Sequence, residues 1–281
     1  MTVYYATALK EHFPEIWARM RRFLAKKNIV YSEIHSNNLW IRDWMPIRTV
    51  EGYTKFRYGL EERFPRFSIA SSRWINYASN TSDIYLDGGN VEQNGTHVLM
   101  TTMVFKRNPK WTKKQLTLEL ERLFEKKIVF LPSEPGDDLG HIDGIARFVT
   151  PNAVFINNYA VMHQVAYTEY QHKLESILSK VGIETILFPY AYDKCPKVSE
   201  EEFRKQYPFA DDFNPGVGYY INWYKMDDLI FLPTFGIDED KDFEAFRVLA
   251  THFPDYTIIP INCYDLAMLG GLCNCSTWEY K

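Results

Sequence analysis

The sequence has no block of consecutive basic residues, although it contains 32 lysines and arginines. These are outnumbered by 36 aspartates and glutamates, which gives a formal net charge of −4 at pH 7. Proteins that bind nucleic acid usually concentrate basic side chains on a surface that displaces counterions from the phosphate backbone. We therefore expect no nucleic-acid partner for this chain.

Long apolar runs and a disulfide framework are also missing. No stretch of about 18 consecutive apolar residues occurs, and the first residues, MTVYYATALKEHFPEIW, lack the basic segment, apolar run and small cleavage residues of a secretion signal. We expect a cytoplasmic protein with no membrane association. The four cysteines are too few and too unevenly spaced for a disulfide scaffold, which predicts reduced thiols. They are Cys195, Cys263, Cys273 and Cys275.

No Gly/Ser-rich or low-complexity linker divides the chain, so we expect residues 1–281 to form one catalytic domain. A helical apolar pattern, a short turn and a β-branched strand recur together four times. These copies cover residues 9–34, 113–132, 167–189 and 241–261. The wider gap after the first copy predicts a divergent fifth unit around residues 55–105. Such units bury their apolar faces by packing around a shared centre, although an ordinary α/β sandwich fits the same pattern.

Four polar stretches fall between the repeated elements: WIRDWMP (40–46), LDGGNVEQNG (86–95), GDDLGHIDGIARF (136–148) and LGGLCNCST (269–277). Their glycine pairs allow the backbone to approach a ligand closely. Taken singly, each stretch has a simpler interpretation, such as an Arg42–Asp43 ion pair or a hairpin turn at residues 88–90. His141 and Asp143 also suit two metal ligands, but no third ligand follows at a familiar spacing.

Taken together, the stretches indicate one kind of chemistry. They supply a cysteine near a glycine pair, a histidine in a Gly-His-x-Asp segment and carboxylates in three separate loops. These are a nucleophile, an acid/base and a binding site for a cation. A planar guanidinium fits several carboxylates best, because its N–H donors form a fixed fork. The sequence therefore predicts cysteine-based chemistry on a guanidine.

The motifs WIRDWMP, LDGGN, GDDLGHIDGIARF, GYYINWYKMDDLIFLPTFGID and LGGLCNCST resemble the agmatine deiminase and bacterial peptidyl-arginine deiminase family of guanidine-modifying enzymes. They occur in the order of that family and cover roughly residues 37–281. The resemblance implies an α/β fold, namely a five-bladed pseudo-symmetric α/β propeller of the pentein type with its active site at the centre. It also implies that the enzyme needs no metal and no organic cofactor.

The same resemblance assigns roles to individual residues. Cys275 would be the nucleophile and His141 the general acid/base, while Asp43 and Asp143 would bind the guanidinium nitrogens. Arg42 would give structural support. The residues expected to contact the substrate are Asp87, Asn222, Trp44 and Asn90.

Three departures from the family pattern concern the substrate. Asp87 replaces the usual glutamate, Trp44-Met45 replaces a small flexible pair, and Asn274 replaces a histidine. We expect a small cationic guanidine as the substrate, with agmatine tried first. A deiminase of peptidyl arginine or another alkylguanidine, an amidinotransferase and a catalytically silent guanidine-binding protein remain alternatives. The sequence leaves open whether the chain assembles as a homo-oligomer.

Overall fold

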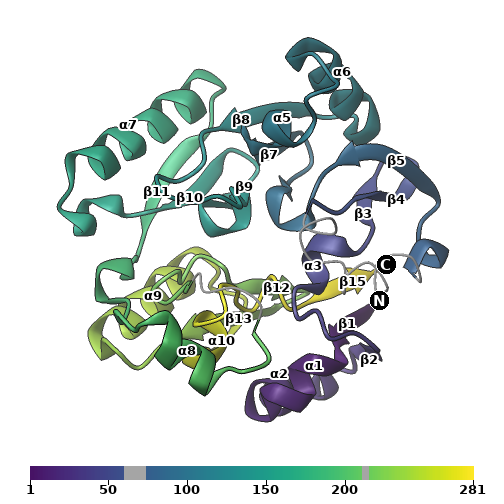
Figure 1. The fold of residues 1–281 in the computed structure, drawn as a ribbon. Coiled ribbons are helices and arrows are strands. Elements are labelled where there is room, and N and C mark those ends of the chain that lie inside the picture. Colours follow the sequence, from purple (N-terminus) through teal and green to yellow (C-terminus); the bar gives the residue numbers. More distant parts are fainter. Residues whose placement is uncertain (60–73, 211–214) are drawn as a thin grey trace.

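The structure is a computed structural model that describes residues 1–59, 74–210 and 215–281. In this part of the chain, the strands form five three-stranded sheets arranged around a common centre, with the longer helices on the outside (Figure 1). The sheets consist of β15 (Trp278–Tyr280), β1 (Thr2–Ala6) and β2 (Val30–Ile34); β3 (Ile47–Thr49), β4 (Gly52–Arg57) and β5 (Asn80–Tyr85); β6 (Glu92–Gln93), β7 (His97–Thr101) and β8 (Lys127–Leu131); β9 (Ala146–Thr150), β10 (Ala153–Asn157) and β11 (Glu184–Phe188); and β12 (Tyr224–Met226), β13 (Leu229–Thr234) and β14 (Thr257–Asn262).

All five sheets share one topology. The first strand pairs antiparallel with the second, and the second pairs parallel with the third. Parallel neighbours need a crossover connection, and in four sheets a helix provides it. These helices are α2 (Pro14–Lys26), α6 (Lys113–Phe124), α7 (Val165–Lys180) and α9 (Glu239–His252). The five-bladed α/β propeller is thus confirmed, and the sandwich alternative is wrong.

Local sequence explains where these helices begin and which face they bury. In α6, Thr112 and Gln115 form a reciprocal capping box, which satisfies backbone N–H groups at the helix start. The apolar residues of α6 recur at helical spacing, and Leu116, Leu120 and Leu123 are buried between the helix and its sheet. The helix ends at Glu125, which adopts a left-handed conformation.

The four predicted helix–strand units match these four blades, but the predicted bounds of the fifth unit are wrong. Its sheet spans residues 47–85, whereas residues 92–105 already belong to the next blade, with β6, β7 and the start of α5 (Met103–Arg107). The sequence pattern was misleading because β6 has only two residues. Part of the predicted window, residues 60–73, lies outside the described residues.

The two ends of the chain close the ring. β15 near the C-terminus pairs antiparallel with β1, in a register that places Thr2 opposite Tyr280 (Figure 1). The N-terminal blade therefore takes its first strand from the far end of the sequence. Among the described helices, none is long and apolar enough to span a lipid bilayer.

The first strands of the five sheets, β15, β3, β6, β9 and β12, face the centre of the propeller and are called the inner strands below (Figure 1). β3 and β15 directly follow two of the polar segments singled out in the sequence, β6 and β9 overlap two others, and β12 lies just after Asn222 in the motif at residues 218–238. The fold thereby brings together residues that lie more than 200 positions apart in the chain.

Candidate active site

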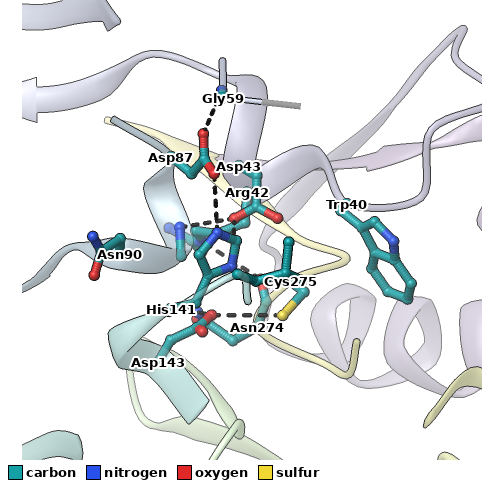
Figure 2. Close-up of polar contacts among 12 residues, drawn as sticks. Trp40, Arg42, Asp43, Gly59, Asp87, Asn90, His141, Asp143, Asn274 and Cys275 are labelled. Atoms are coloured by element: carbon teal, nitrogen blue, oxygen red, sulfur yellow. Dashed lines mark hydrogen bonds and ion pairs between the residues drawn. The ribbon is translucent and has the colours of Figure 1, made fainter. Parts of the chain in front are cut away.

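Short turns that precede the inner strands carry the predicted site residues, and Asp43, Asp87, His141, Asp143 and Cys275 lie close together (Figure 2). Asp43 is part of α3 (Ile41–Trp44), and Asp87 directly precedes η3 (Gly88–Asn90). His141 directly precedes η4 (Ile142–Gly144), and Asp143 is part of it. Asn222 lies just before β12, and Cys275 lies just before β15.

A cavity of about 240 Å³ opens at this ring of turns and is called the front cavity below. His141, Asp143, Asn222 and Cys275 form one part of its wall. Glu134, Asp137 and three tyrosines form another, and the tyrosines are Tyr167, Tyr192 and Tyr219. The front cavity thus combines a thiol, an imidazole, an amide and several carboxylates within a space that suits a small molecule.

His141 is buried between two carboxylates. Its Nε2 atom lies 3.0 Å from Oδ2 of Asp87, and its Nδ1 atom lies 3.7 Å from Oδ1 of Asp43. Burial on its own would lower the histidine pKa, but the two carboxylates outweigh it and raise the pKa to about 9. The imidazole is therefore protonated at neutral pH and available as a proton donor.

Asp87 lies behind His141 and is held from several sides. One carboxylate oxygen accepts a hydrogen bond from the Gly59 amide at 2.8 Å, and the other contacts Arg107 as well as His141. Burial would raise the Asp87 pKa, but the hydrogen bond from His141 and the charge of Arg107 keep it below its usual value. Asp87 was expected to contact the substrate, but it is not among the described residues that line the front cavity. The structure instead gives it the position of a support for His141.

The glycine pair before β6 permits this close arrangement. A Cβ atom on Gly89 would lie 2.6 Å from Oδ1 of Asp43 and 2.8 Å from Nδ1 of His141. A Cβ atom on Gly88 would lie 2.0 Å from the Arg42 carbonyl oxygen. A side chain at position 89 would therefore displace Asp43 and His141, and one at position 88 would displace the Arg42 backbone. The Gly89 amide also donates a 2.8 Å hydrogen bond to Asp43.

Asp43 and its neighbour Arg42 do not form the ion pair that their adjacency allows. Arg42 Nη2 lies 2.9 Å from Glu279 Oε2, and its Nε donates to the Asn274 carbonyl at 3.3 Å. Asp43 faces His141 instead (Figure 2). Burial raises the Asp43 pKa, as do the nearby carboxylates of Asp87 and Asp143, although His141 opposes this. The Asp43 carboxylate lacks a full positive partner of its own.

Cys275 lies among hydrogen-bond acceptors. Its Sγ is 3.5 Å from Oδ2 of Asp143 and 3.4 Å from Oδ1 of Asn222. The Asn274 side chain donates a 2.8 Å hydrogen bond to the same oxygen of Asp143 (Figure 2). Burial raises the Cys275 pKa well above its ordinary value, and the charges of Asp143 and Asp43 raise it further. Without a ligand, Cys275 is held as a neutral thiol.

The neighbouring Cys273 faces another direction. It is fully buried in the hydrophobic core, where its Sγ lies 3.5 Å from Sγ of Cys263. Periodicity alone could not choose between Cys273 and Cys275, because residues two apart on an extended strand share a face. The segment is not extended: a turn covers residues 273–276, so the two thiols point to different places. All four cysteines of the chain are free thiols.

Two of the residues predicted to bind the substrate lie elsewhere. Trp44 is only 1% exposed and packs with Met45, Tyr58 and Trp278 in a core cluster. The expectation that Trp44 contacts the substrate is therefore wrong, because its side chain and that of Met45 are both buried in the core. Asn90 accepts a 2.8 Å hydrogen bond from the Thr101 amide, and its side chain lies apart from Cys275 (Figure 2). It stabilises the loop and does not contact the front cavity.

Three features of the site were not found from the sequence. Arg107 at the end of α5 belongs to no motif, yet it contacts Asp87. Trp40 packs against Gly271 so closely that a Cβ atom on that glycine would lie 2.3 Å from the ring, and Gly271 lines the front cavity. Glu134 lies two residues before the polar segment 136–148, and the tyrosines near it come from one blade and from the connection to the next.

A pentein propeller with a cysteine, a histidine and carboxylates at its centre defines the class of guanidine-modifying C–N hydrolases. The model of the Porphyromonas-type peptidyl-arginine deiminase family matches residues 6–280, and the chain belongs to this family.

Individual relatives agree with this assignment. The agmatine deiminase of Pseudomonas putida is 26% identical over an alignment that covers 92% of this chain and 78% of that protein. Among solved structures, the agmatine deiminase of Enterococcus faecalis superposes with a TM-score of 0.72 at 18% identity, covering 99% of this chain and 92% of the other. A Campylobacter jejuni agmatine deiminase with substrate bound gives a TM-score of 0.71 at 17% identity, with the same coverage. These superpositions show that the fold is shared.

Proposed function

We propose that this chain is a guanidine iminohydrolase that converts agmatine to a ureido product and ammonia through a covalent intermediate on Cys275. One observation carries the proposal. The Cys275 thiol, the His141 imidazole and the Asp143 carboxylate share one wall of the front cavity, with Cys275 Sγ 3.5 Å from the Asp143 carboxylate. A guanidinium bound to Asp143 would place its central carbon next to the sulfur.

The buried carboxylates support a cationic substrate. Asp43 and Asp143 are 6% and 2% exposed, and no lysine or arginine lies within ion-pair distance of either among the described residues. Asp43 shares the charge of His141 with Asp87, and Asp143 has no cation within ion-pair distance among the described residues. A guanidinium that enters the site would therefore gain charge-assisted hydrogen bonds from both carboxylates. The same positive charge offsets the acidic surroundings of Cys275 and lowers its pKa, so that substrate binding favours the thiolate.

The reaction then follows from the positions of the groups. The Cys275 thiolate attacks the central guanidinium carbon, and His141 transfers a proton to the departing nitrogen, which leaves as ammonia. The product of this step is an S-alkylthiouronium. His141, now neutral, takes a proton from a water molecule that attacks the same carbon. Collapse of this adduct releases the ureido product and regenerates the Cys275 thiolate; the remaining proton of the added water passes to solvent, where the released ammonia takes it up, and His141 stays protonated.

The second part of the front cavity favours a substrate with a distal amine. The Glu134 carboxylate is 5% exposed and accepts hydrogen bonds from Tyr159, Tyr190 and Tyr219 at 3.1, 2.8 and 2.9 Å. No cation pairs with it among the described residues. An ammonium group would find a carboxylate and tyrosine rings there, both of which attract cations. A free α-carboxylate would be repelled, which favours agmatine over arginine.

Ammonia release tests the proposal. We expect turnover of agmatine, weaker turnover of a simple alkylguanidine without an amine, and little turnover of free arginine or of peptides with a C-terminal arginine. Cys275→Ala should abolish release, whereas Cys273→Ala should retain it if the variant folds. Release of the alkylamine of the substrate in place of ammonia, dependent on an added amine acceptor, would indicate an amidinotransferase. Binding of agmatine without any ammonia release would indicate a silent guanidine-binding protein.

A further inference from the structure

A second and larger cavity, of about 660 Å³, shares no lining residue with the front cavity and is called the rear cavity below. It is lined by residues of all five inner strands and of the turns beside them. The rear cavity therefore lies where the five blades meet.

Cationic side chains dominate the rear cavity. Six of them line it: Arg42, Arg48, Lys126, Arg147, Lys225 and Lys281. Among the described residues, two acidic side chains line the rear cavity, and each is paired with an arginine. Glu279 pairs with Arg42 at 2.9 Å, and Glu92 pairs with Arg147 at 3.0 Å.

The other cations lack an acidic partner. Within the described part of the chain, no carboxylate lies within ion-pair distance of Arg48, Lys126 or Lys225. Lys126 donates to the side chain of Gln93, and Lys225 lies near the aromatic rings of Trp223 and Phe253. Neither contact neutralises the charge.

The pKa values of Lys126 and Lys225 are both lowered in these surroundings. Burial lowers the pKa of Lys126, and the charge of Arg48 lowers it further. Burial likewise lowers the pKa of Lys225, and Arg147 and Lys281 add to the effect, although Glu92 opposes it. A concave surface lined by one sign of charge concentrates counter-ions from solution.

From this arrangement we infer that the rear cavity is a binding site for a small multivalent anion that carries phosphate or carboxylate groups. Its volume lies in the range of small-molecule sites. Arginine and lysine side chains that enter from different blades can surround several oxyanion groups at once. The proposed substrate of the front cavity is a cation, so the two cavities would bind ligands of opposite charge.

The rear cavity borders the active site. Arg42 and Asn274 line it, and the Arg42 amide donates a 3.1 Å hydrogen bond to the Cys275 carbonyl. Asn274 also holds Asp143 through its side chain. An anion that binds to Arg42 would therefore contact the layer of residues that supports the nucleophile.

Calorimetric titration of the full chain with inorganic pyrophosphate and with citrate tests the inference. We expect saturable binding of at least one probe, weakened by added salt. The double variant Lys126→Gln/Lys225→Gln should bind at least tenfold more weakly. The matched double variant Lys173→Gln/Lys180→Gln removes two exposed charges from α7 and should bind as the unaltered protein does. Circular dichroism establishes that each variant is folded.

Binding of both probes would show that charge is recognised, and binding of pyrophosphate alone would identify a phosphate ligand. If the double lysine variant fails to fold, the exposed Arg48 offers a second test, because Arg48→Gln should weaken binding several-fold. Absence of saturable binding to both probes, or equal binding by all variants, would overturn the inference. The titration needs no guanidine substrate, so its outcome is independent of the proposed deiminase reaction.

Discussion

Asp87 Oδ2 lies 3.0 Å from His141 Nε2, while Asp43 lies on the Nδ1 side of the same ring. The imidazole is thus held from both nitrogens by buried carboxylates, which fixes its orientation and favours its protonated form. Asp87 is in turn held by Arg107 and by the Gly59 amide. This second layer of contacts makes Asp87 a positioning residue for the acid/base.

Replacement of Asp87 by asparagine should change the pH dependence of catalysis. The His141 pKa is raised to about 9, so its protonated form is lost only on the alkaline side. Asp87→Asn removes one of the charges that raise it, and the alkaline limb of kcat/KM should move to lower pH by about one unit or more. The control is Asp138→Asn, which removes an exposed carboxylate three residues before His141 in the chain. An unchanged alkaline limb would exclude this role for Asp87.

The guanidinium-binding role of Asp43 and Asp143 predicts large losses on charge removal. Asp43→Asn and Asp143→Asn keep the side-chain shape. Loss of a charge-assisted contact should cost about 2 to 4 kcal/mol, and because about 1.4 kcal/mol already corresponds to a factor of ten, each variant should lose at least tenfold in kcat/KM. Because the Asp43 pKa is raised, activity should also rise as this carboxylate ionises with increasing pH. Asp43→Asn should abolish that acidic limb. Near-normal kcat/KM in Asp43→Asn would show that Asp43 serves only to hold His141.

Much of this arrangement was accessible from sequence because it depends on local pattern. Helical and strand periodicity identified four blades, and glycine pairs beside polar residues identified the turns at the centre. The direction of individual side chains was not accessible. In the single turn of α3, consecutive residues point about 100° apart, so Arg42, Asp43 and Trp44 face an ion pair, the histidine and the core respectively. Packing from distant blades decides which residue faces which way.

Trp44 should therefore matter for stability and not for specificity. Truncation of a buried aromatic side chain removes packing and leaves a cavity, so Trp44→Ala should lower the free energy of unfolding by about 3 to 5 kcal/mol. Urea denaturation measures this loss. The milder Trp44→Phe should fold and leave the ranking of guanidine substrates unchanged. Trp40→Ala, whose ring contacts Gly271 in the wall of the front cavity, should raise KM with a smaller loss of stability. A changed ranking of guanidine substrates in Trp44→Phe would contradict the assignment of Trp44 to the core.

The raised pKa of the Glu134 carboxyl group predicts that the free energy of unfolding depends on pH. Burial raises its pKa to about 7, although the tyrosine hydroxyls oppose the shift. In the unfolded chain the group ionises near its ordinary value of 4.5, so between about pH 4.5 and 7 the folded state binds more protons. Its contribution to stability is therefore complete at low pH and is lost as pH rises through 7, by about 2 to 3 kcal/mol. Denaturation between pH 5 and 8 should show a smaller decline in Glu134→Gln. Parallel curves for the two proteins would rule out the raised pKa.

Selective labelling should distinguish the two neighbouring cysteines. Cys275 lines the front cavity beside Asp143, whereas Cys273 is enclosed in the core beside Cys263. A haloacetamidine carries a planar cationic amidine, so the carboxylates that bind guanidinium should hold it with its halogen-bearing carbon near the Cys275 sulfur. The same positive charge lowers the thiol pKa and increases the thiolate fraction. Peptide mapping should find the label on Cys275, and agmatine should protect against it. Neutral iodoacetamide is the control, and it should label Cys275 more slowly because it does not relieve the acidic surroundings of the thiol. Label on Cys273 with Cys275 unmodified, or full activity in Cys275→Ala, would rule out Cys275 as the nucleophile.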